Sequence, residues 1–120
     1  ISFNELSQIK SAIGVVHMDA QIEEYIIELV DATRHPELYG LHELKKYIAF
    51  GVSSRVSIDM FKASRAMAFL RKKDFVSPVD IALVAKELMR HRMVLTYEAE
   101  ADGVDADVVI GRILEGVRVP

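Results

Sequence analysis

Apolar residues recur at helical spacing through most of the chain, and the strict alternation of a half-buried strand is scarce. Between residues 20 and 34 they follow the i, i+3, i+4, i+7 spacing of one buried helix face. These positions are Ile22, Tyr25, Ile26, Leu29, Val30 and Thr33. Asp19 is a suitable N-cap for this helix, and Pro36 ends it because proline disfavours the α conformation at the residue before it. The pattern therefore predicts an all-α fold.

A first and a third helix are expected before and after this segment. Ser2 and Glu5 have capping-box spacing, which predicts a helix over about residues 3–13. From about Ser54 to Arg71 the sequence is apolar nearly all round. A helix of that kind is typical of a central, largely buried position.

Two further helices have clear N-terminal signals. Ser77 as N-cap, Pro78 at the first helical position and Asp80 at the third agree on one start. Asp105 precedes the last helix, which is expected to end near Gly116. Together these segments predict a compact bundle of about five helices.

Three segments between the helices are less regular. Residues 37–51 are expected to form a connection with about one turn of helix near residues 42–47. The stretch 93–97 fits either a continued helix or an extended segment, because its periodicity does not separate the two. Residues 98–103 are acidic and are expected to form a loop.

The composition fits one globular domain with its own core. The chain has 120 residues, of which 51% are hydrophobic, 28% are charged and none is cysteine. Residues 1–120 are therefore interpreted as a single helical domain that needs no disulfide. No apolar run approaches the roughly 20 residues of a membrane span, and the lack of cysteine fits a reducing, cytoplasmic setting. The apolar start and the bare Val119-Pro120 end suggest a piece of a longer chain.

The charge balance argues against a nucleic-acid-binding surface over the whole domain. The formal net charge is −3, from 15 basic and 18 acidic residues, so the chain lacks a global positive field. Residues 55–73 are locally basic, with six Lys or Arg against the single acid Asp59. This stretch is either an ordinary solvated helix face or a surface that meets an anion.

Familiar catalytic and metal-binding patterns are missing. No glycine is followed by lysine, so the chain has no GxxxxGK[ST] phosphate-binding loop. The four histidines lack the spacing of a zinc site, and the serines lack the GxSxG context of a nucleophile. The sequence therefore predicts neither a catalytic centre nor a metal site within this chain.

The run GVSSR at residues 51–55 holds the candidate binding site. Its small, turn-prone residues place Arg55 in the first turn of the third helix, where backbone NH groups favour anions. A planar guanidinium there suits phosphate oxygens. Arg55 is thus the candidate anion-binding residue, with Gly51, Ser53 and Ser54 in supporting positions. The alternative from composition alone is an ordinary solvated arginine near a helix start.

Arg34 is a second candidate cation. It lies at the expected end of the second helix, just before His35-Pro36. A cation is favourable there against the helix dipole whatever the protein does. Its position is therefore explained equally well by helix stability and by a supporting role in anion binding.

Four motifs in the same order resemble the C-terminal lid domain of MoxR-type AAA+ ATPases, the branch that includes magnesium-chelatase-like subunits. The motifs are YIIELVDATR at 25–34, GVSSR at 51–55 with ASRA at 63–66, DFVSPVD at 74–80, and RHRM at 90–93 with YEAE at 97–100. The usual run of that family is Gly-Ala-Ser-Pro-Arg-Ala, so this chain departs from it at Val52, Ser54 and Val56. The arginine and its small neighbours are kept.

The resemblance implies that Arg55 is a sensor-2 arginine. It would reach the γ-phosphate of ATP held with Mg²⁺ on a P-loop AAA+ domain of the same or a neighbouring subunit. The lid would then act as sensor and lever in a homo-oligomeric ring. The parent protein would be an ATPase with chaperone-like or metal-insertion work, and a von Willebrand factor A domain protein would be a candidate partner.

Two other functions stay open from the residues alone. A helical adaptor would bind a partner protein through an apolar groove, and Arg55 would then have no special role. A small DNA-binding module is the other alternative, because residues 58–92 resemble a helix-turn-helix and Arg71-Lys72-Lys73 is basic. That module predicts duplex binding that weakens steeply with salt.

Overall fold

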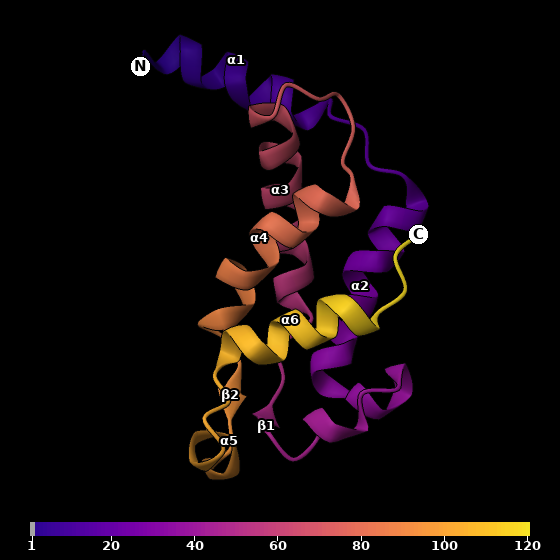
Figure 1. Ribbon diagram of the computed structural model, residues 1–120. Helices are drawn as coiled ribbons and strands as arrows, with labels where there is room; N and C mark the ends of the chain where they lie inside the picture. Colours follow the sequence, from indigo (N-terminus) through magenta and orange to yellow (C-terminus); the bar gives the residue numbers. More distant parts are fainter. Residues whose placement is uncertain (1) are drawn as a thin grey trace.

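Helices make up most of the chain in the computed structural model, which describes residues 2–120 (Figure 1). The elements in chain order are α1 (Phe3–Gly14), α2 (Ala20–Arg34), the 3-10 helices η1 (Pro36–Tyr39) and η2 (His42–Leu44), β1 (Ile48–Phe50), α3 (Arg55–Leu70), α4 (Pro78–Arg90), β2 (Val94–Leu95), α5 (Tyr97–Ala101) and α6 (Ala106–Gly116). The predicted all-α class is confirmed. Within the described residues the strands form only a two-stranded ribbon.

The core lies where α2, α3, α4 and α6 meet. α3 packs mainly along α4 and also against α2, and α6 lies across α4 and α2 (Figure 1). Nonpolar side chains from all four helices are fully buried there, among them Ile26, Leu29, Met60, Ile81 and Ile110. The apolar stripes predicted for the second, fourth and last helices therefore build the centre of the bundle.

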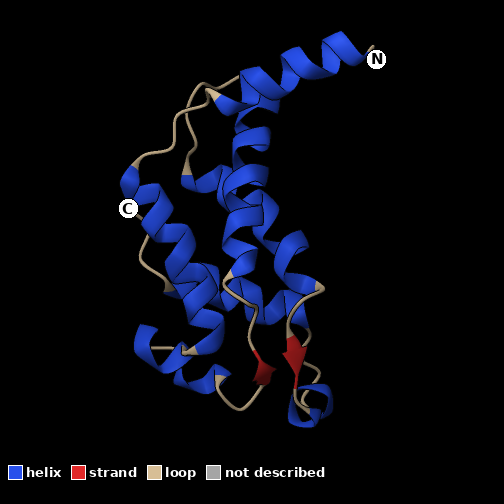
Figure 2. Ribbon diagram, turned by 180° about the vertical axis from the view of Figure 1, so that it is seen from behind, coloured by secondary structure: helices blue, strands red, loops and turns tan. Residues whose placement is uncertain are grey.

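α1 projects from one end of the bundle and contributes no buried residue (Figures 1 and 2). Its predicted cap is present, because Ser2 Oγ accepts a hydrogen bond from the Glu5 backbone N at 3.1 Å. Its apolar side chains remain accessible, and Phe3 is 87% exposed. The described chain is accordingly elongated, with extents of 50 × 29 × 21 Å.

α3 is less buried than its composition predicts. Its buried positions are Val56, Met60, Ser64 and Ala68, a stripe that recurs every fourth residue. Ile58 on another face is 51% exposed. The prediction of a largely buried helix is therefore wrong, because α2 and α4 cover one side of α3 and leave the other open. None of the helices in residues 2–120 is both long and apolar enough to cross a membrane.

The chain around the ribbon decides one open alternative and corrects one expectation. β2 pairs antiparallel with β1, with Ile48 opposite Leu95, so the stretch after α4 is extended rather than a continued helix. Residues 98–103 were expected to form a loop, but most of them belong to α5. Thr96 Oγ1 caps this short helix by accepting from the Ala99 backbone N at 3.3 Å. Both views place the ribbon at the opposite end of the molecule from α1 (Figure 2).

The connection between α2 and α3 is also more structured than expected. The sequence predicted about one turn of helix near residues 42–47, whereas the chain forms η1, η2 and then β1. Leu44 of η2 is only 2% exposed and holds this connection to the core. The path returns the chain to the end of α2 just before α3 begins.

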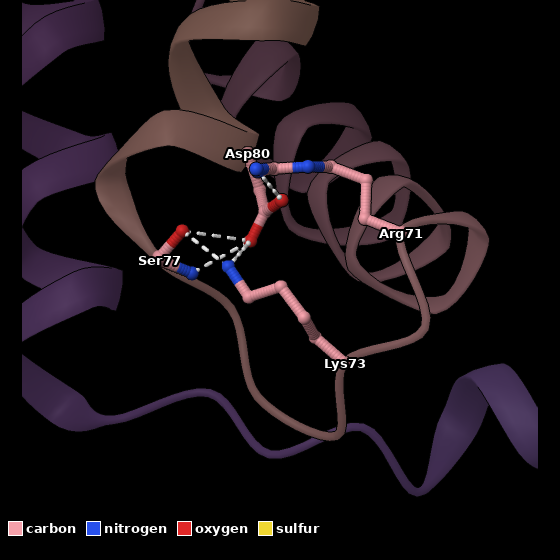
Figure 3. Close-up of polar contacts among 4 residues, drawn as sticks. All are labelled: Arg71, Lys73, Ser77 and Asp80. Carbon is pink, nitrogen blue, oxygen red and sulfur yellow. Dashed lines mark hydrogen bonds and ion pairs between the residues drawn. The ribbon is translucent and has the colours of Figure 1, made fainter.

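A buried carboxylate, Asp80, ties the start of α4 to the end of α3 (Figure 3). Its side chain is fully buried and accepts hydrogen bonds from Arg71 Nη1 at 2.8 Å, Lys73 Nζ at 3.1 Å and the Ser77 backbone N at 2.8 Å. Burial by itself raises the pKa of this carboxyl, but the bonds from Ser77, Lys73 and Arg71 outweigh burial and hold the pKa below its usual value. The predicted capping box of Ser77 and Asp80 is confirmed.

The turn that carries Arg71 and Lys73 to Asp80 contains a left-handed residue. Lys72 has a φ of 61°, and the Lys73 backbone N donates to Ala68 O at 2.9 Å. This hydrogen-bond pattern is that of a Schellman helix end, at which glycine is the usual left-handed residue. The geometry of the ion pairs thus depends on a strained backbone position.

Replacing Asp80 with asparagine is expected to destabilise the fold by about 2–4 kcal/mol, because two cations lose their buried counter-charge. In the wild-type chain this stabilisation is present above the unfolded-state pKa of Asp80 and is lost as the pH falls through its lower folded-state pKa. Urea unfolding from neutral to acidic pH should show this acid-dependent loss in the wild type and a smaller one in Asp80→Asn.

Glu23→Gln is the matched control for Asp80→Asn. Glu23 also lies in the first turn of a helix, but its side chain is exposed and bonds to no other side chain in residues 2–120. We expect a change below about 0.5 kcal/mol for this variant. An Asp80→Asn chain as stable as the wild type at neutral pH would contradict this account.

Lys72→Gly is expected to stabilise the fold by about 0.5–1 kcal/mol, because glycine has no Cβ to oppose a left-handed backbone. The midpoint of urea unfolding measures the gain. Lys72→Ala removes the same charge but keeps the Cβ, so it should show no comparable increase. Equal gains in stability in both variants would show that loss of the lysine charge, and not relief of backbone strain, stabilises the fold.

Candidate functional site

The turn of residues 51–55 lies against the C-terminal end of α2. Gly51 approaches α2 so closely that a Cβ at this position would lie 2.5 Å from the Thr33 carbonyl oxygen and 2.8 Å from Arg34 Cγ. A side chain here would force the backbone of the turn away from α2. The supporting position predicted for Gly51 thus has a steric basis.

The Thr33 hydroxyl anchors the next residue of the turn. It donates to Val30 O at 2.7 Å and accepts from the Val52 backbone N at 3.0 Å. Thr33 is 1% exposed and Val52 is fully buried, so this NH depends on the hydroxyl and not on water. Val52, one of the departures from the usual lid run, therefore serves as part of the core.

The turn ends where α3 begins, at Arg55. Ser53 Oγ accepts from the Arg55 backbone N at 3.3 Å. The backbone N atoms of Val56 and Ser57 donate to the carbonyl oxygens of Ser53 and Ser54. These NH groups already have acceptors inside the turn, so they give no direct support to the predicted anion site. Ser53 contributes its hydroxyl to the turn, while Ser54 contributes its carbonyl.

The side chain of Arg55 is what remains available to a ligand. It is solvent-exposed and forms no ion pair within residues 2–120. A cation at a helix N-terminus opposes the helix dipole. Each of the other five α-helices of the described chain has an acidic residue in its first turn, whereas α3 has none. Helix stability therefore does not explain Arg55, whereas a bound anion would.

Arg34 borders the same turn from the end of α2. It lines an open groove of about 530 Å³ together with Gly51, Ser53 and Ser54. Its side chain is exposed. The structure thus brings Arg34 and the three supporting residues of the turn to one surface.

The acidic residue one turn before Arg34 is already bonded elsewhere. Asp31 accepts hydrogen bonds from His35 Nδ1 at 3.0 Å and from the Tyr39 hydroxyl at 2.8 Å. The bonds from His35 and Tyr39 lower the pKa of Asp31, while burial and the bond to Asp31 raise the pKa of Tyr39 to about 12. Within residues 2–120, Arg34 is left without an ion-pair partner.

On the other side of the turn, Arg55 borders a hollow of about 180 Å³ with Ser53, Val56, Asp59 and Arg92. Asp59 lies one helical turn after Arg55, and Arg92 follows the end of α4. Arg92 Nη1 donates to Asp59 Oδ2 at 2.7 Å. Two cations and one carboxylate therefore meet here, and Asp59 is paired with Arg92.

The other end of the basic stretch at residues 55–73 is not a free cationic surface. Arg71 and Lys73 both form ion pairs with Asp80. Two of the three cations in the Arg71-Lys72-Lys73 run are thus bound internally. This finding weakens the observation that suggested a DNA-binding module.

Three residues that shape this region were not predicted as site residues. The spacing of Thr33 places it on the apolar face of α2, but nothing in the sequence indicates that its hydroxyl binds the turn. Asp59 and Arg92 are 33 residues apart, so their pairing is a tertiary contact. Arg92 does lie in one of the motifs that resemble the lid family, which is the signal that could have directed attention to it.

Comparisons with known proteins agree with each other. A family model described as the AAA lid domain matches residues 43–113. The chain is 41% identical to chaperone MoxR1 of Mycobacterium tuberculosis over 97 residues, which are 81% of this chain and 26% of that protein. It is 39% identical to the Bacillus subtilis protein YeaC over 106 residues, which are 88% of this chain and 30% of that protein.

A solved structure has the same fold. The crystal structure of a Cytophaga hutchinsonii protein assigned as an ATPase matches with a TM-score of 0.93 and 41% identity, over 98% of this chain and 36% of that one. The chain spans about a quarter to a third of the length of the curated relatives it matches. The turn of residues 51–55 lies inside the region that the family model matches.

Gly51→Ala is expected to destabilise the fold by about 1–3 kcal/mol, because its Cβ would meet backbone atoms of Thr33 that cannot rotate away. Urea unfolding of the 120-residue chain measures the loss. Gly111→Ala in α6 is the control, since a Cβ there meets no atom within 4 Å. That change should leave stability unchanged or raise it by up to about 1 kcal/mol. Similar losses in both variants would disprove the close approach at Gly51.

Proposed function

The chain belongs to the AAA lid domain family and is the lid of a MoxR-like ATPase, and from this premise we propose that it senses nucleotide through Arg55. In this proposal Arg55 is the sensor-2 arginine. It contacts the γ-phosphate of ATP, which a separate P-loop domain holds together with Mg²⁺. The observation that carries the proposal is the exposed guanidinium at the start of α3, which has no ion-pair partner among residues 2–120.

The chemistry of phosphoryl transfer suits such a residue. Negative charge shifts among the phosphoryl oxygens during transfer, and a positioned cation stabilises it. A guanidinium offers parallel NH donors in a fixed plane that matches two phosphate oxygens. The chain has no phosphate-binding loop of its own, so the nucleotide is expected on another domain. The relatives are three to four times as long as the matched segment, which leaves room for that domain.

The attachment of the turn supports a role in transmitting the nucleotide state. Arg55 follows a turn that is bonded to Thr33 of α2 and closely packed at Gly51. α3 in turn packs along α4. When the γ-phosphate leaves, Arg55 loses its contact and the lid is free to move as a unit relative to the P-loop domain. Arg34, which borders the other side of the same turn, would add positive potential to the site.

The proposed partners follow from this role. The P-loop domain belongs to the same subunit or to a neighbouring one, and the full ATPase assembles as a homo-oligomeric ring in the cytoplasm. One relative is named chaperone MoxR1, which supports chaperone-like remodelling as the work that the ring performs; metal insertion is proposed only from the resemblance to the wider family. A von Willebrand factor A domain protein is the proposed partner in that work.

Arg55→Ala in the full-length ATPase is expected to lower ATP turnover by at least about tenfold, because the cation that stabilises the transferred phosphoryl group is lost. Affinity for a non-hydrolysable ATP analogue should fall more than affinity for ADP, since only the former carries a γ-phosphate. Steady-state turnover and equilibrium binding measure the two effects. Arg55→Lys should give an intermediate result, because it keeps the charge without the planar donors.

Lys62→Ala is the control for this test. Lys62 is an exposed cation on the same helix, away from the turn, and its loss should leave turnover within about twofold of wild type. Unchanged turnover in Arg55→Ala would rule out the sensor-2 role and favour a helical adaptor. Unfolding curves of both variants should match the wild type, since neither side chain is buried.

A further inference from the structure

Asp59 is an acidic side chain placed to compete for Arg55. It follows Arg55 by four residues on α3, and this spacing puts the two side chains on one helix face within ion-pair reach. Both border the same hollow of about 180 Å³. An ion pair between them would neutralise the guanidinium and take up NH donors that phosphate would otherwise use.

That pair is not formed, because Asp59 is held from the other side. Arg92 Nη1 lies 2.7 Å from Asp59 Oδ2, and no ion pair of Arg55 is present within residues 2–120. The backbone that carries Arg92 is well fixed. Its N donates to Met89 O at 3.1 Å, and the flanking residues Met89 and Met93 are both buried. Arg92 therefore presents its exposed guanidinium to Asp59 from a turn whose backbone is anchored by the buried residues Met89 and Met93.

We propose that Arg92 is a positioning residue that binds Asp59 and thereby keeps Arg55 free for phosphate. The inference rests on the proposed sensor-2 role of Arg55. It explains why the Arg55 guanidinium has no ion-pair partner within residues 2–120, which the family match does not address. Arg92 does not itself contact nucleotide in this account. It acts by removing a competing carboxylate from the face of α3 that Arg55 occupies.

The expected size of the effect follows from the exposure of the groups. The side chains of Arg92 and Asp59 are 48% and 40% exposed, and an exposed ion pair at i, i+4 spacing is weak. Capture of Arg55 by a released Asp59 would therefore reduce the population of free guanidinium by only about two- to fivefold. The effect should also shrink as salt screens the pair.

Arg92→Ala in the full-length ATPase tests the proposal. We expect affinity for a non-hydrolysable ATP analogue to fall about two- to fivefold, affinity for ADP to change less, and turnover to fall in parallel. The decisive variant is Arg92→Ala combined with Asp59→Asn, which removes the competing charge. It should restore binding and turnover to near the wild-type level, and Asp59→Asn alone should retain them.

Raising the ionic strength provides a second readout. The ratio of wild-type to Arg92→Ala affinity should approach one as salt increases, because the competing Arg55–Asp59 pair is exposed. If Arg92→Ala proves unstable in thermal unfolding, Arg92→Gln replaces it. Glutamine keeps most of the side-chain volume while removing the charge that holds Asp59.

The results distinguish the positioning role of Arg92 from the sensor-2 role of Arg55, on which it rests. If Arg55→Ala has no effect, the sensor-2 role fails and the positioning role fails with it. If Arg55→Ala is impaired but Arg92→Ala is not, only the positioning role is overturned. A defect in Arg92→Ala that Asp59→Asn does not rescue overturns it as well, because Arg92 would then contact nucleotide directly or support the fold.

Discussion

The hydroxyl of Thr33 is the contact on which the geometry of the candidate site depends. It joins the last turn of α2 to the turn before α3 by bonding to both Val30 O and the Val52 backbone N. Loss of the hydroxyl would leave a buried NH unpaired, at a cost of about 1–3 kcal/mol. Because Gly51 packs on the Thr33 carbonyl at the same point, the two helices cannot separate here without breaking both contacts. The backbone positions from which Arg34 and Arg55 extend are therefore tied together.

Two acidic residues near this turn are bonded elsewhere, and within residues 2–120 neither arginine has an ion-pair partner. Asp31 bonds to His35 and Tyr39, and Asp59 bonds to Arg92. Ion pairs as exposed as these contribute about 0–1 kcal/mol each to stability. Their importance is that, within residues 2–120, they leave Arg34 and Arg55 without ion-pair partners. Asp80 differs because it is buried and holds two cations at once. The ion pairs of Asp80 therefore determine how the end of α3 joins the start of α4.

Local signals in the sequence predict those parts of the fold that local hydrogen bonds determine. The cap at Asp19 and the capping box of Ser77 and Asp80 give helix starts that the structure confirms. The ribbon and the partial burial of α3 depend on segments far apart in the chain, which periodicity does not reveal, whereas α5 begins at a local cap, Thr96, that was not predicted. The candidate site likewise has a part that the sequence predicts and a part that depends on tertiary contacts. Motif resemblance points to Arg55, whereas the anchor at Thr33 and the pairing of Asp59 with Arg92 are tertiary contacts.

The two ends of α3 are fixed by different means, and this difference bears on the proposed sensor role of Arg55. At its start, the turn is bonded to α2 through Thr33. At its end, Arg71 and Lys73 are paired with Asp80 at the start of α4. Both ends of α3 are therefore bonded to neighbouring helices, and contacts with α2 and α4 oppose a displacement of α3 alone. Under the proposed sensor role of Arg55, we expect movement in response to nucleotide between the lid and a P-loop domain, and not within the lid.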